Sequence, residues 1–422
     1  GGGIYFPNGT YVIETGLTLD QPISIFGTGN SSILKASDDV TSPIYTDESA
    51  LITCIAGSDG SIFRDLELQG SKIDAASNRQ RGVYLNGAKK CILQNLVFSG
   101  PDNSTGLNFG VDINGVNSGE TVVKDCRFER LVSSSSEDNG TAILIEASNE
   151  NLIADNVIDS TNSDSDSAAI FLSAATGGVG SVDNVIRGNR IINHTQAGIS
   201  ITSITYYEMT GNLVACDRNL IQDNDISYCS VASGGEASSG IAMVGNSSFN
   251  KFTGNHIHYN GHSSGGGYGI SIVGTQQGTS DPGQPKLDET PNYNEIRDNI
   301  VRYNKDDGIR INGAINTIIK DNVLYENGQR TADTFGNIKI VAVGGTSTGN
   351  DSVVDGNVCL GTQVQYQIKI GASVSSTLIY GNRIPTGGTG SVLDEGTALI
   401  MGVNYDSSNN IGIGLSGSGT TT

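Results

Sequence analysis

The sequence predicts an all-β solenoid, because a short strand unit repeats, an Asn recurs within that unit, and a partner strand follows it. The unit is clearest in residues 294–327, which read NEIRDNIVRYNKDDGIRINGAINTIIKDNVLYEN. Twice in this stretch an alternating apolar segment is followed by Asp-Asn, a second such segment and a polar turn. Such alternation is typical of β-strands. The interval from Asn299 to Asn322 is shorter than the roughly 30 residues of a βαβ unit. The strands therefore turn corners without intervening helices.

The Asn of this unit marks a corner through most of the chain. Asn suits a turn that enters the left-handed region, and its amide can bond the Asn of the next coil or nearby backbone groups. We therefore expect a structural role for it. The position is occupied by Asn95, Asn156, Asn189, Asn224, Asn255, Asn299, Asn322, Asn357 and Asn382, with Asp65 and Cys126 in two further units.

The partner strand has a Gly-Ile-x-Ile pattern. It recurs at residues 82–85, 110–113, 142–145, 169–172, 198–201, 240–243, 269–272, 308–311, 337–340 and 367–370. A repeat of this length cannot bury its apolar face alone, so stacked coils must form the core. Like residues then lie above like, which predicts inward ladders of Ile, Val and Leu on parallel strands.

These repeats resemble those of the right-handed parallel β-helix proteins of the pectate lyase superfamily. The resemblance covers about residues 1 to 400. It implies one single-stranded right-handed parallel β-helix of roughly 10 to 13 coils. The opening, GGGIYFPNGTY, resembles the segment that follows the N-terminal helix in many pectate lyase-like and phage tailspike chains. We therefore expect a capping helix, signal peptide or virion anchor to precede it.

Two regions are expected within this architecture. Residues 1–386 are assigned to the β-helix, which grows by adding coils and so needs no division into domains. Residues 387–422 form a Gly/Ser/Thr-rich tail. A solenoid must cover its last open edge, so this tail is expected to cap the final coil or dock on another subunit. The resemblance to tailspikes implies a homotrimer.

Composition excludes some partners. The formal net charge of −20 argues against nucleic acid, which requires dense Lys and Arg. No apolar run reaches the roughly 18 residues that suggest a membrane helix. The superfamily resemblance implies a polysaccharide substrate and an extracellular location: secreted, on a cell surface or on a virion.

The six cysteines show no metal-binding spacing. Cys54, Cys91, Cys126 and Cys359 are interpreted as small buried side chains. Cys216 and Cys229 flank one coil, so they could form a disulfide. No cofactor is expected, except that Ca2+ could bind the oxygen-rich segment DSTNSDSD at residues 159–166. A solvated loop is the alternative reading of that segment.

Insertions after the strands predict a groove along the side of the solenoid. One group follows the Asn strands, at residues 133–139, 160–167, 230–239, 261–267 and 327–335. The other follows the Gly-Ile-x-Ile strands, at residues 174–181, 202–217 and 275–293. Each group should project from one edge of the solenoid. Two walls beside a flat strand face would suit a long, extended ligand.

The first and third residues after each Asn are expected to point outward. The first set reads Leu96, Arg127, Val157, Arg190, Asp225, His256, Ile300 and Val323, and the third reads Phe98, Glu129, Asp159, Ile192, Ser227, His258, Arg302 and Tyr325. Tyr228, Tyr259 and Tyr303 follow at the turn. Since neighbouring strands lie about 4.8 Å apart, Arg190, Asp225, His256, His258 and Arg302 should form one patch.

This patch is the preferred candidate site. In β-elimination of a uronate, an Arg neutralises the carboxylate, a His or Tyr removes the C5 proton, and a Tyr or His protonates the leaving oxygen. The assigned catalytic residues are Asp225, His256, His258, Tyr259 and Arg302. Arg190, Tyr228, Tyr303 and Asp159 are assigned to substrate binding. The competing interpretation is a solvated sheet face whose charges pair across coils.

A second candidate is a set of carboxylates that stacked coils could bring together. It comprises Asp112, Glu129, Glu146, Asp159, Asp164 and Asp166. Glycoside hydrolysis needs two carboxyl groups roughly 5 to 10 Å apart. The sequence therefore predicts a polysaccharide lyase or glycoside hydrolase. The alternative is a non-catalytic β-helix that binds glycan or spans distance, because fold alone does not decide function.

Overall fold

The computed structural model describes residues 2–39, 50–71, 80–101, 106–131, 140–159, 168–174, 179–203, 214–230, 238–261, 266–276, 288–331, 334–342, 351–384, 390–396, 400–402, 404–405 and 415–416. The chain forms two compact units, Gly1–Ser200 and Ile201–Thr422. Each unit is described separately. The described residues contain strands and turns but no helix, and so no helix that could cross a membrane.

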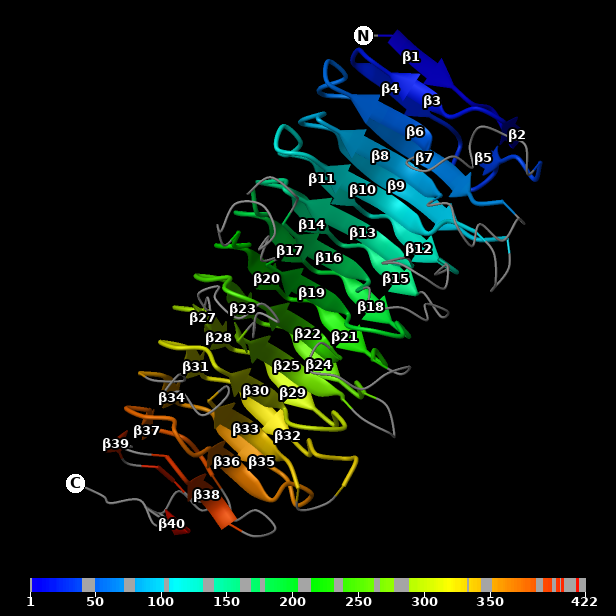
Figure 1. Cartoon of the computed structure of the whole chain (residues 1–422). Coiled ribbons are helices and arrows are strands. Elements are labelled where there is room, and N and C mark those ends of the chain that lie inside the picture. The colour runs from blue at the N-terminus through cyan, green and yellow to red at the C-terminus, as the bar shows by residue number, and fades with distance from the viewer. Residues whose placement is uncertain are drawn as a thin grey trace. The chain divides into compact units, whose positions relative to one another are not determined.

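Unit 1 consists of parallel strands in three stacks (Figure 1). The first stack contains β1 (Gly2–Tyr5), β4 (Ile23–Phe26), β11 (Val122–Lys124), β14 (Leu152–Ala154) and β17 (Val185–Arg187). The second contains β2 (Gly9–Ile13), β5 (Ser32–Ala36), β12 (Arg127–Glu129), β15 (Val157–Asp159) and β18 (Arg190–Ile192). The longer β7 (Ile62–Gln69) and β9 (Ile92–Ser99) run through both stacks. The third contains β3 (Leu17–Leu19), β6 (Ala50–Ile55), β8 (Arg81–Asn86), β10 (Phe109–Asn114), β13 (Thr141–Glu146) and β16 (Ile170–Ser173).

Unit 2 repeats this arrangement, and β19 (Ile199–Thr202) contains the boundary between the units. Its first stack contains β20 (Leu220–Gln222), β23 (Lys251–Thr253), β28 (Glu295–Arg297), β31 (Ile318–Lys320), β34 (Val353–Asp355), β37 (Leu378–Tyr380) and β39 (Ile400–Met401). The second contains β21 (Asp225–Ser227), β24 (His256–His258), β29 (Ile300–Arg302), β32 (Val323–Tyr325) and β35 (Val358–Leu360). The third contains β22 (Ser239–Val244), β25 (Tyr268–Val273), β30 (Ile309–Asn312), β33 (Gly336–Val341), β36 (Tyr366–Ile370), β38 (Gly390–Asp394) and β40 (Leu415–Ser416). β26 (Thr275–Gln276) and β27 (Asp288–Glu289) pair antiparallel.

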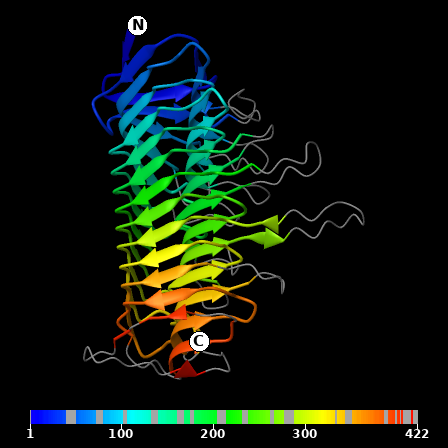
Figure 2. The same cartoon turned by 90° about the vertical axis from the view of Figure 1, so that its left-hand side faces the viewer.

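Inward positions repeat from coil to coil and form the core. In the second stack of unit 2, Ile226 is level with Ile257, and Ile257 with Val301. All three are fully buried. Figure 2 shows strands of successive coils side by side within each unit. Because successive strands of a stack contribute apolar residues to such ladders, each coil completes the core of the next. The predicted parallel β-helix is confirmed.

A hydrogen-bonded Asn ladder fixes the corner between the first and second stacks of unit 2. The backbone N–H of Asn255 donates to Oδ1 of Asn299 at 2.9 Å, and its side-chain amide donates to the same atom at 3.0 Å. That amide also donates to the carbonyl of Ile221. The preceding residue has a positive φ, as at Asp223 and Gly254. Gly254 and Asp223 occupy equivalent positions on neighbouring coils. A Cβ at Gly254 would clash with the Asp223 carboxylate, which explains why this position is Gly in the coil of Asn255.

The ladder prediction was wrong by one residue at Asn95 and Asp65. Strand register places Val97 level with Arg127, so Leu96 is level with Cys126. Asn95 and Asp65 instead occupy the preceding position and have φ of 51° and 56°. In consequence Leu96 and Phe98, expected to face outward, are buried. The first coils therefore have an apolar corner where later coils have Asn.

All six cysteines are buried thiols, so the predicted Cys216–Cys229 disulfide was wrong. Burial raises the pKa of Cys126 to about 12, which makes this thiol unreactive. Within the predicted tail, β38, β39 and β40 continue the parallel pairing of β36 and β37. Most of residues 387–422 lie outside the described residues. The capping or oligomerisation role of the tail stays a prediction.

Candidate functional site

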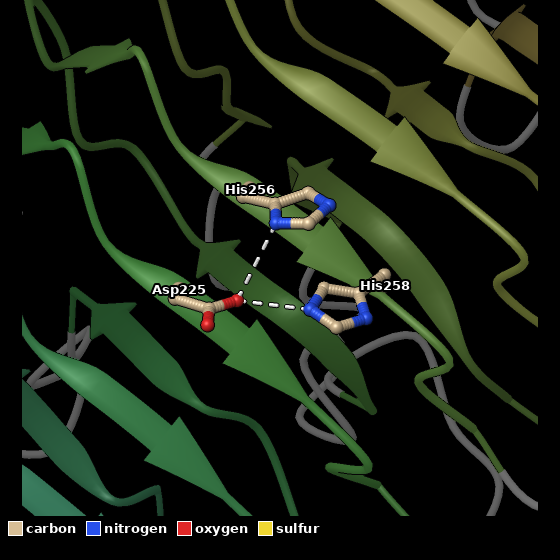
Figure 3. Close-up of side chains that lie close together, drawn as sticks. All are labelled: Asp225, His256 and His258. Carbon is tan, nitrogen blue, oxygen red and sulfur yellow. Dashed lines mark hydrogen bonds and ion pairs between the residues drawn. The ribbon is translucent and has the colours of Figure 1, made fainter.

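The outward face of the second stack in unit 2 brings together one Asp and two His side chains. Asp225 of β21 is level with His256 of β24, and His258 lies two positions further along the same strand. Alternation along β24 directs both histidines to the outer face. Oδ1 of Asp225 lies 2.9 Å from Nε2 of His258 and 3.6 Å from Nδ1 of His256. Figure 3 shows both imidazoles directed toward this carboxylate.

The three side chains are accessible from outside. Asp225 is 47% exposed, His256 33% and His258 15%. The imidazole rings stack with centroids 4.2 Å apart. Burial, then His258 and Arg302, lower the pKa of His256, whereas Asp225 opposes this effect. His256 is therefore neutral and able to accept a proton at neutral pH.

Arg302 contributes a cation on the next coil. It is level with His258. Its Nε is buried and makes no hydrogen bond, and the guanidinium makes no ion pair with any described residue. The guanidinium carbon lies 5.9 Å from the centroid of the Tyr303 ring. An Arg held in this way can accept a carboxylate through its guanidinium fork.

A column of tyrosines borders the cluster. Tyr228, Tyr259 and Tyr303 each have a positive φ, of 54°, 56° and 54°. Their rings stack at 5.4 Å and 5.0 Å, so both faces of Tyr259 are covered by its neighbours. Tyr259 also meets His258 edge-on at 5.4 Å. The column thus offers ring edges and hydroxyl groups to a ligand, rather than open faces for a sugar ring. A positive φ recurs at the same corner of other coils, at Arg130, Asn193 and Glu326, so it belongs to the turn of the solenoid.

The predicted patch is only partly assembled within one unit. Asp225, His256, His258, Tyr259 and Arg302 gather as expected, and Tyr228 and Tyr303 adjoin them. Arg190 and Asp159 belong to unit 1, so their place in this site stays a prediction. Arg190 is exposed, and Asp159 accepts a hydrogen bond from the side chain of Asn193. Most of the predicted wall loops, and the Ca2+ segment beyond Asp159, lie outside the described residues.

The second candidate set is only partly assembled. Asp112 and Glu146 lie on the third stack of unit 1, whereas Glu129 and Asp159 lie on the second stack. Asp112 is fully buried and bonds Nε of Arg81 at 2.6 Å. Asp164 and Asp166 are outside the described residues. Glu129 and Asp159 are level on the adjacent strands β12 and β15, so this pair alone keeps the proximity of two carboxylates that was predicted.

Asp225, His256 and His258 could also hold a metal. One donor atom from each lies within 4.8 Å of the other two. Carboxylate and imidazole donors suit a divalent transition ion. The same separations suit a direct Asp–His hydrogen bond, which accounts for the 2.9 Å contact without an ion.

Sequence reasoning missed a buried charged cluster in unit 2. Asp306 and Asp307 directly precede Gly308 of the Gly-Ile-x-Ile strand, and both are fully buried. Burial raises the pKa of Asp306 to about 6, and it also raises the pKa of Asp307. Around them lie Arg310, Arg330 and Lys339. The sequence did contain a signal for this cluster. The outward x position of the Gly-Ile-x-Ile strand is Arg310 on one coil and Lys339 on the next.

Comparisons with known proteins agree with this architecture. Residues 1–156 match a family model described as rhamnogalacturonase A/epimerase, pectate lyase-like. A search of curated protein sequences finds no match. The A-module of the Azotobacter vinelandii mannuronan C-5 epimerase AlgE6 has a TM-score of 0.55 at 15% identity, over 96% of this chain and 91% of that chain. The Dettilon tailspike protein gp208 has a TM-score of 0.54 at 14% identity, over 94% of this chain and 63% of that one.

A variant of the periplasmic alginate epimerase AlgG gives a TM-score of 0.50 at 14% identity, over 94% of this chain and 78% of that chain. At such identities these structures share the fold with this chain. Together with the family match over residues 1–156, they confirm the resemblance that the repeats indicated: the chain is a parallel β-helix protein, and its residues 1–156 match the pectate lyase-like family model.

Proposed function

We propose that this chain is a polysaccharide-active enzyme that removes a proton from carbon in a uronate-containing glycan and cleaves the glycan by β-elimination. The observation that carries the proposal is the contact of one Asp225 oxygen with His256 and His258 on the adjacent strand. An imidazole oriented by a carboxylate is a general base of the kind that such chemistry requires. The cluster is also open to a ligand from outside.

The side chains have distinct roles. Arg302 binds the uronate carboxylate and stabilises the charge that develops when the C5 proton leaves. His256 takes that proton, since its lowered pKa keeps it neutral. Asp225 orients His258, which packs against His256 as a positioning residue. The electron pair from C5–H forms the C4–C5 double bond as the C4–O bond breaks. Tyr259 gives its hydroxyl proton to the leaving oxygen.

Hydrolysis is less well supported at this site. A glycosidase of the usual kind needs two carboxyl groups flanking the scissile bond. The outward residues of β21, β24 and β29, all of which the structure describes, include a single carboxylate, Asp225. A site with one carboxylate, two imidazoles and one guanidinium has the components for proton transfer next to a carboxylate.

The solved structures support the substrate class and the location. Two are named as epimerases of mannuronan or alginate, which are uronate polymers, and one is named as a tailspike protein. We therefore propose a location outside the cytoplasm, whether secreted, on a cell surface or on a virion, and a homotrimer as the assembly. Along the second stack, exposed Ile300 and Val323 extend the face beyond the histidines. A long glycan could lie across several coils of this face.

The experiment is a panel of uronate and neutral polysaccharides incubated with the protein. β-Elimination yields unsaturated ends that absorb ultraviolet light, whereas hydrolysis yields reducing ends without that absorbance. His256→Ala should abolish the ultraviolet signal. A panel in which every glycan binds but none changes would favour the non-catalytic glycan-binding alternative. The exposed Asp–His contact is compatible with that alternative, because surface ion pairs are common.

A further inference from the structure

Two of the buried thiols in unit 1 meet at the corner where the third stack leads into the first. Cys54 is an inward residue of β6 and is level with Leu85 of the next coil. Cys91 ends the turn of that next coil and directly precedes Ile92, the first residue of β9. Both side chains are fully buried. Their thiols act as hydrogen-bond partners, so the two sulfur atoms are neighbours in the core.

The same corner in unit 2 shows that these two positions are within reach of each other. Met243 has the inward position on its strand that Cys54 has on β6, and Asn250 directly precedes a first-stack strand, as Cys91 does. Sδ of Met243 lies 3.5 Å from the side-chain nitrogen of Asn250. An inward residue of the third stack therefore reaches the corner residue. Cys54 differs in that it meets the corner residue of the coil after its own.

Cys91 stands at a corner position that carries Asn in later coils. Asn151 and Asn184 directly precede the first-stack strands of their coils, and the side-chain amide of Asn151 donates to Oδ1 of Asn184 at 2.8 Å. Such a bond ties one coil to the next. Cys91 has no amide, and its Sγ donates to the carbonyl of Lys89 within its own turn. A covalent bond from Cys91 to Cys54 would tie the two coils instead.

The contact makes the two thiols unequal. The hydrogen bond from Cys54 lowers the pKa of Cys91 against the effect of burial, whereas the same bond, together with burial, raises the pKa of Cys54. At Cys126 and Cys359 burial dominates and raises the pKa of the thiol. Because the thiolate is the form that attacks a disulfide, Cys91 is the member of the pair that reacts first.

We propose that Cys54 and Cys91 become joined by a disulfide bond when the chain folds in an oxidising compartment. The oxidant is a disulfide, either of a small molecule or of another protein. The Cys91 thiolate attacks one of its sulfur atoms and displaces the other, and Cys54 then displaces the sulfur bound to Cys91. Each cysteine loses one electron, and the two thiol protons go to the two thiols that are released. The proposed location supplies such a compartment, so in this respect the inference rests on the proposed function.

The bond has to form during folding. In the folded chain both sulfur atoms are fully buried, so a disulfide oxidant cannot reach them. Once formed, the bond would close a loop of chain between β6 and the start of β9 and thereby restrict the unfolded state. It would lie among the first coils, where the corner between the first and second stacks has apolar Leu96 in place of Asn. The bond would therefore stabilise the part of the solenoid that has no Asn at that corner.

The test uses the full chain exported to a bacterial periplasm through an added signal peptide. The folded protein is denatured without reductant, and its free thiols are alkylated. Two of the six cysteines should be protected, so four should carry the label. Trypsin releases Cys54 in residues 36–64 and Cys91 in residues 91–124. Mass spectrometry should find these two peptides as one species, lighter than their sum by two hydrogen atoms.

Two variants sharpen the count of labelled thiols. Cys91→Ala leaves Cys54 without its partner, so all five remaining cysteines should be labelled. The matched control Cys126→Ala removes a buried thiol outside the pair, so the cross-link should persist and three of five cysteines should be labelled. Six labelled cysteines in the folded, exported chain would overturn the proposal, as would a cross-link between other cysteines. Circular dichroism checks that each preparation is folded.

Turnover of the glycan panel is scored on the same preparation of the unsubstituted chain. A cross-linked chain without turnover defeats the proposed function alone. Turnover by a chain in which all six thiols are labelled defeats the disulfide alone.

Discussion

Asn255 and His256 are neighbours in sequence, yet Asn255 belongs to the inner corner of the coil and His256 to its outer face. Asn255 faces the inner corner, is fully buried, and repeats the contacts of Asn224 and Asn299 on the adjacent coils. His256 faces outward, is a third exposed, and lies between Asp225 and Ile300, which resemble neither it nor each other. The comparison shows that inward residues fix the winding of the chain. Outward residues can differ in type from coil to coil, so they can form a catalytic or binding site.

The largest effect on stability should come from substitution of Asn255, the inner residue of this pair. Asn255→Ala removes the Oδ1 that accepts from both the backbone N–H and the side-chain amide of Asn224, and it removes the amide that donates to the carbonyl of Ile221. Each buried donor that loses its acceptor costs about 1–3 kcal/mol, so with two such donors on Asn224 the free energy of unfolding should fall by roughly 2–6 kcal/mol. Urea denaturation measures it. The adjacent His256→Ala should change stability by no more than about 0.5 kcal/mol. An equal loss in both variants would erase the distinction between the two regions.

On the outer face the large effect should be on turnover. His258→Gln removes the imidazole held by Asp225, and we expect kcat to fall about 100-fold or more, as when acid–base catalysis is lost. Asp225→Asn should act through the same contact, so the double variant should be little worse than either single one. Additive losses would show that Asp225 and His258 work independently. Thermal unfolding should be nearly unchanged in all three variants.

A smaller effect is expected at Arg302. Arg302→Lys keeps the charge but loses the guanidinium fork that matches a carboxylate. KM for a uronate substrate should rise about tenfold, equivalent to about 1.4 kcal/mol, with a smaller change for a carboxyl-reduced substrate. Steady-state kinetics on the two substrates provide the measurement. Identical changes for both substrates would mean that Arg302 does not bind the carboxylate.

The buried charged cluster around Asp306 and Asp307 should make stability depend on pH. Asp306 has its pKa raised from 3.8 to about 6 by burial. Between these values the folded state keeps a proton that the unfolded state releases, so this group's contribution to stability is lost as pH rises from about 4 to 6. Asp306→Asn is neutral throughout, so its melting temperature relative to that of the unsubstituted chain should increase across this window. If the difference in melting temperature stayed constant across this window, the ionisation would belong to a group other than Asp306.

A chelator should have no effect on turnover, which is the smallest effect predicted. If the 2.9 Å contact between Asp225 and His258 is a direct hydrogen bond, EDTA should leave turnover unchanged. Loss of turnover with EDTA, and its recovery with Zn2+, would instead make Asp225, His256 and His258 a metal centre. Turnover with and without each reagent distinguishes the two.

The inward pattern was predictable because every coil repeats it. One Gly-Ile-x-Ile strand predicts the next, and the shared inner corner needs the same Asn hydrogen bonds each time. The error at Asn95 arose where the repeat weakens: Leu96 replaces Asn at the corner, and the polar residue one step earlier mimics it. Periodicity alone cannot distinguish two adjacent polar corner positions.

Outward residues were predictable where the corner Asn of each coil was identified correctly. Counting from Asn224 and Asn255 was enough to place Asp225 beside His256 and His258. The Asp306 cluster was missed because Arg330 reaches it from a turn, outside the strand ladder, and because burial of a carboxyl cannot be read from its neighbours in sequence. Arg190 and Asp159 lie in the other unit, so strand counting has not been tested for them.

The most direct test of the proton-transfer site is proton NMR of a uronate oligosaccharide in D2O, with the unsubstituted chain and with the Asp225→Asn variant. The account predicts that the unsubstituted chain removes the C5–H signal and produces an unsaturated sugar, while the variant leaves the spectrum unchanged. New reducing ends with the C5–H signal intact would contradict it, because the bond would then have been hydrolysed without removal of a proton from carbon.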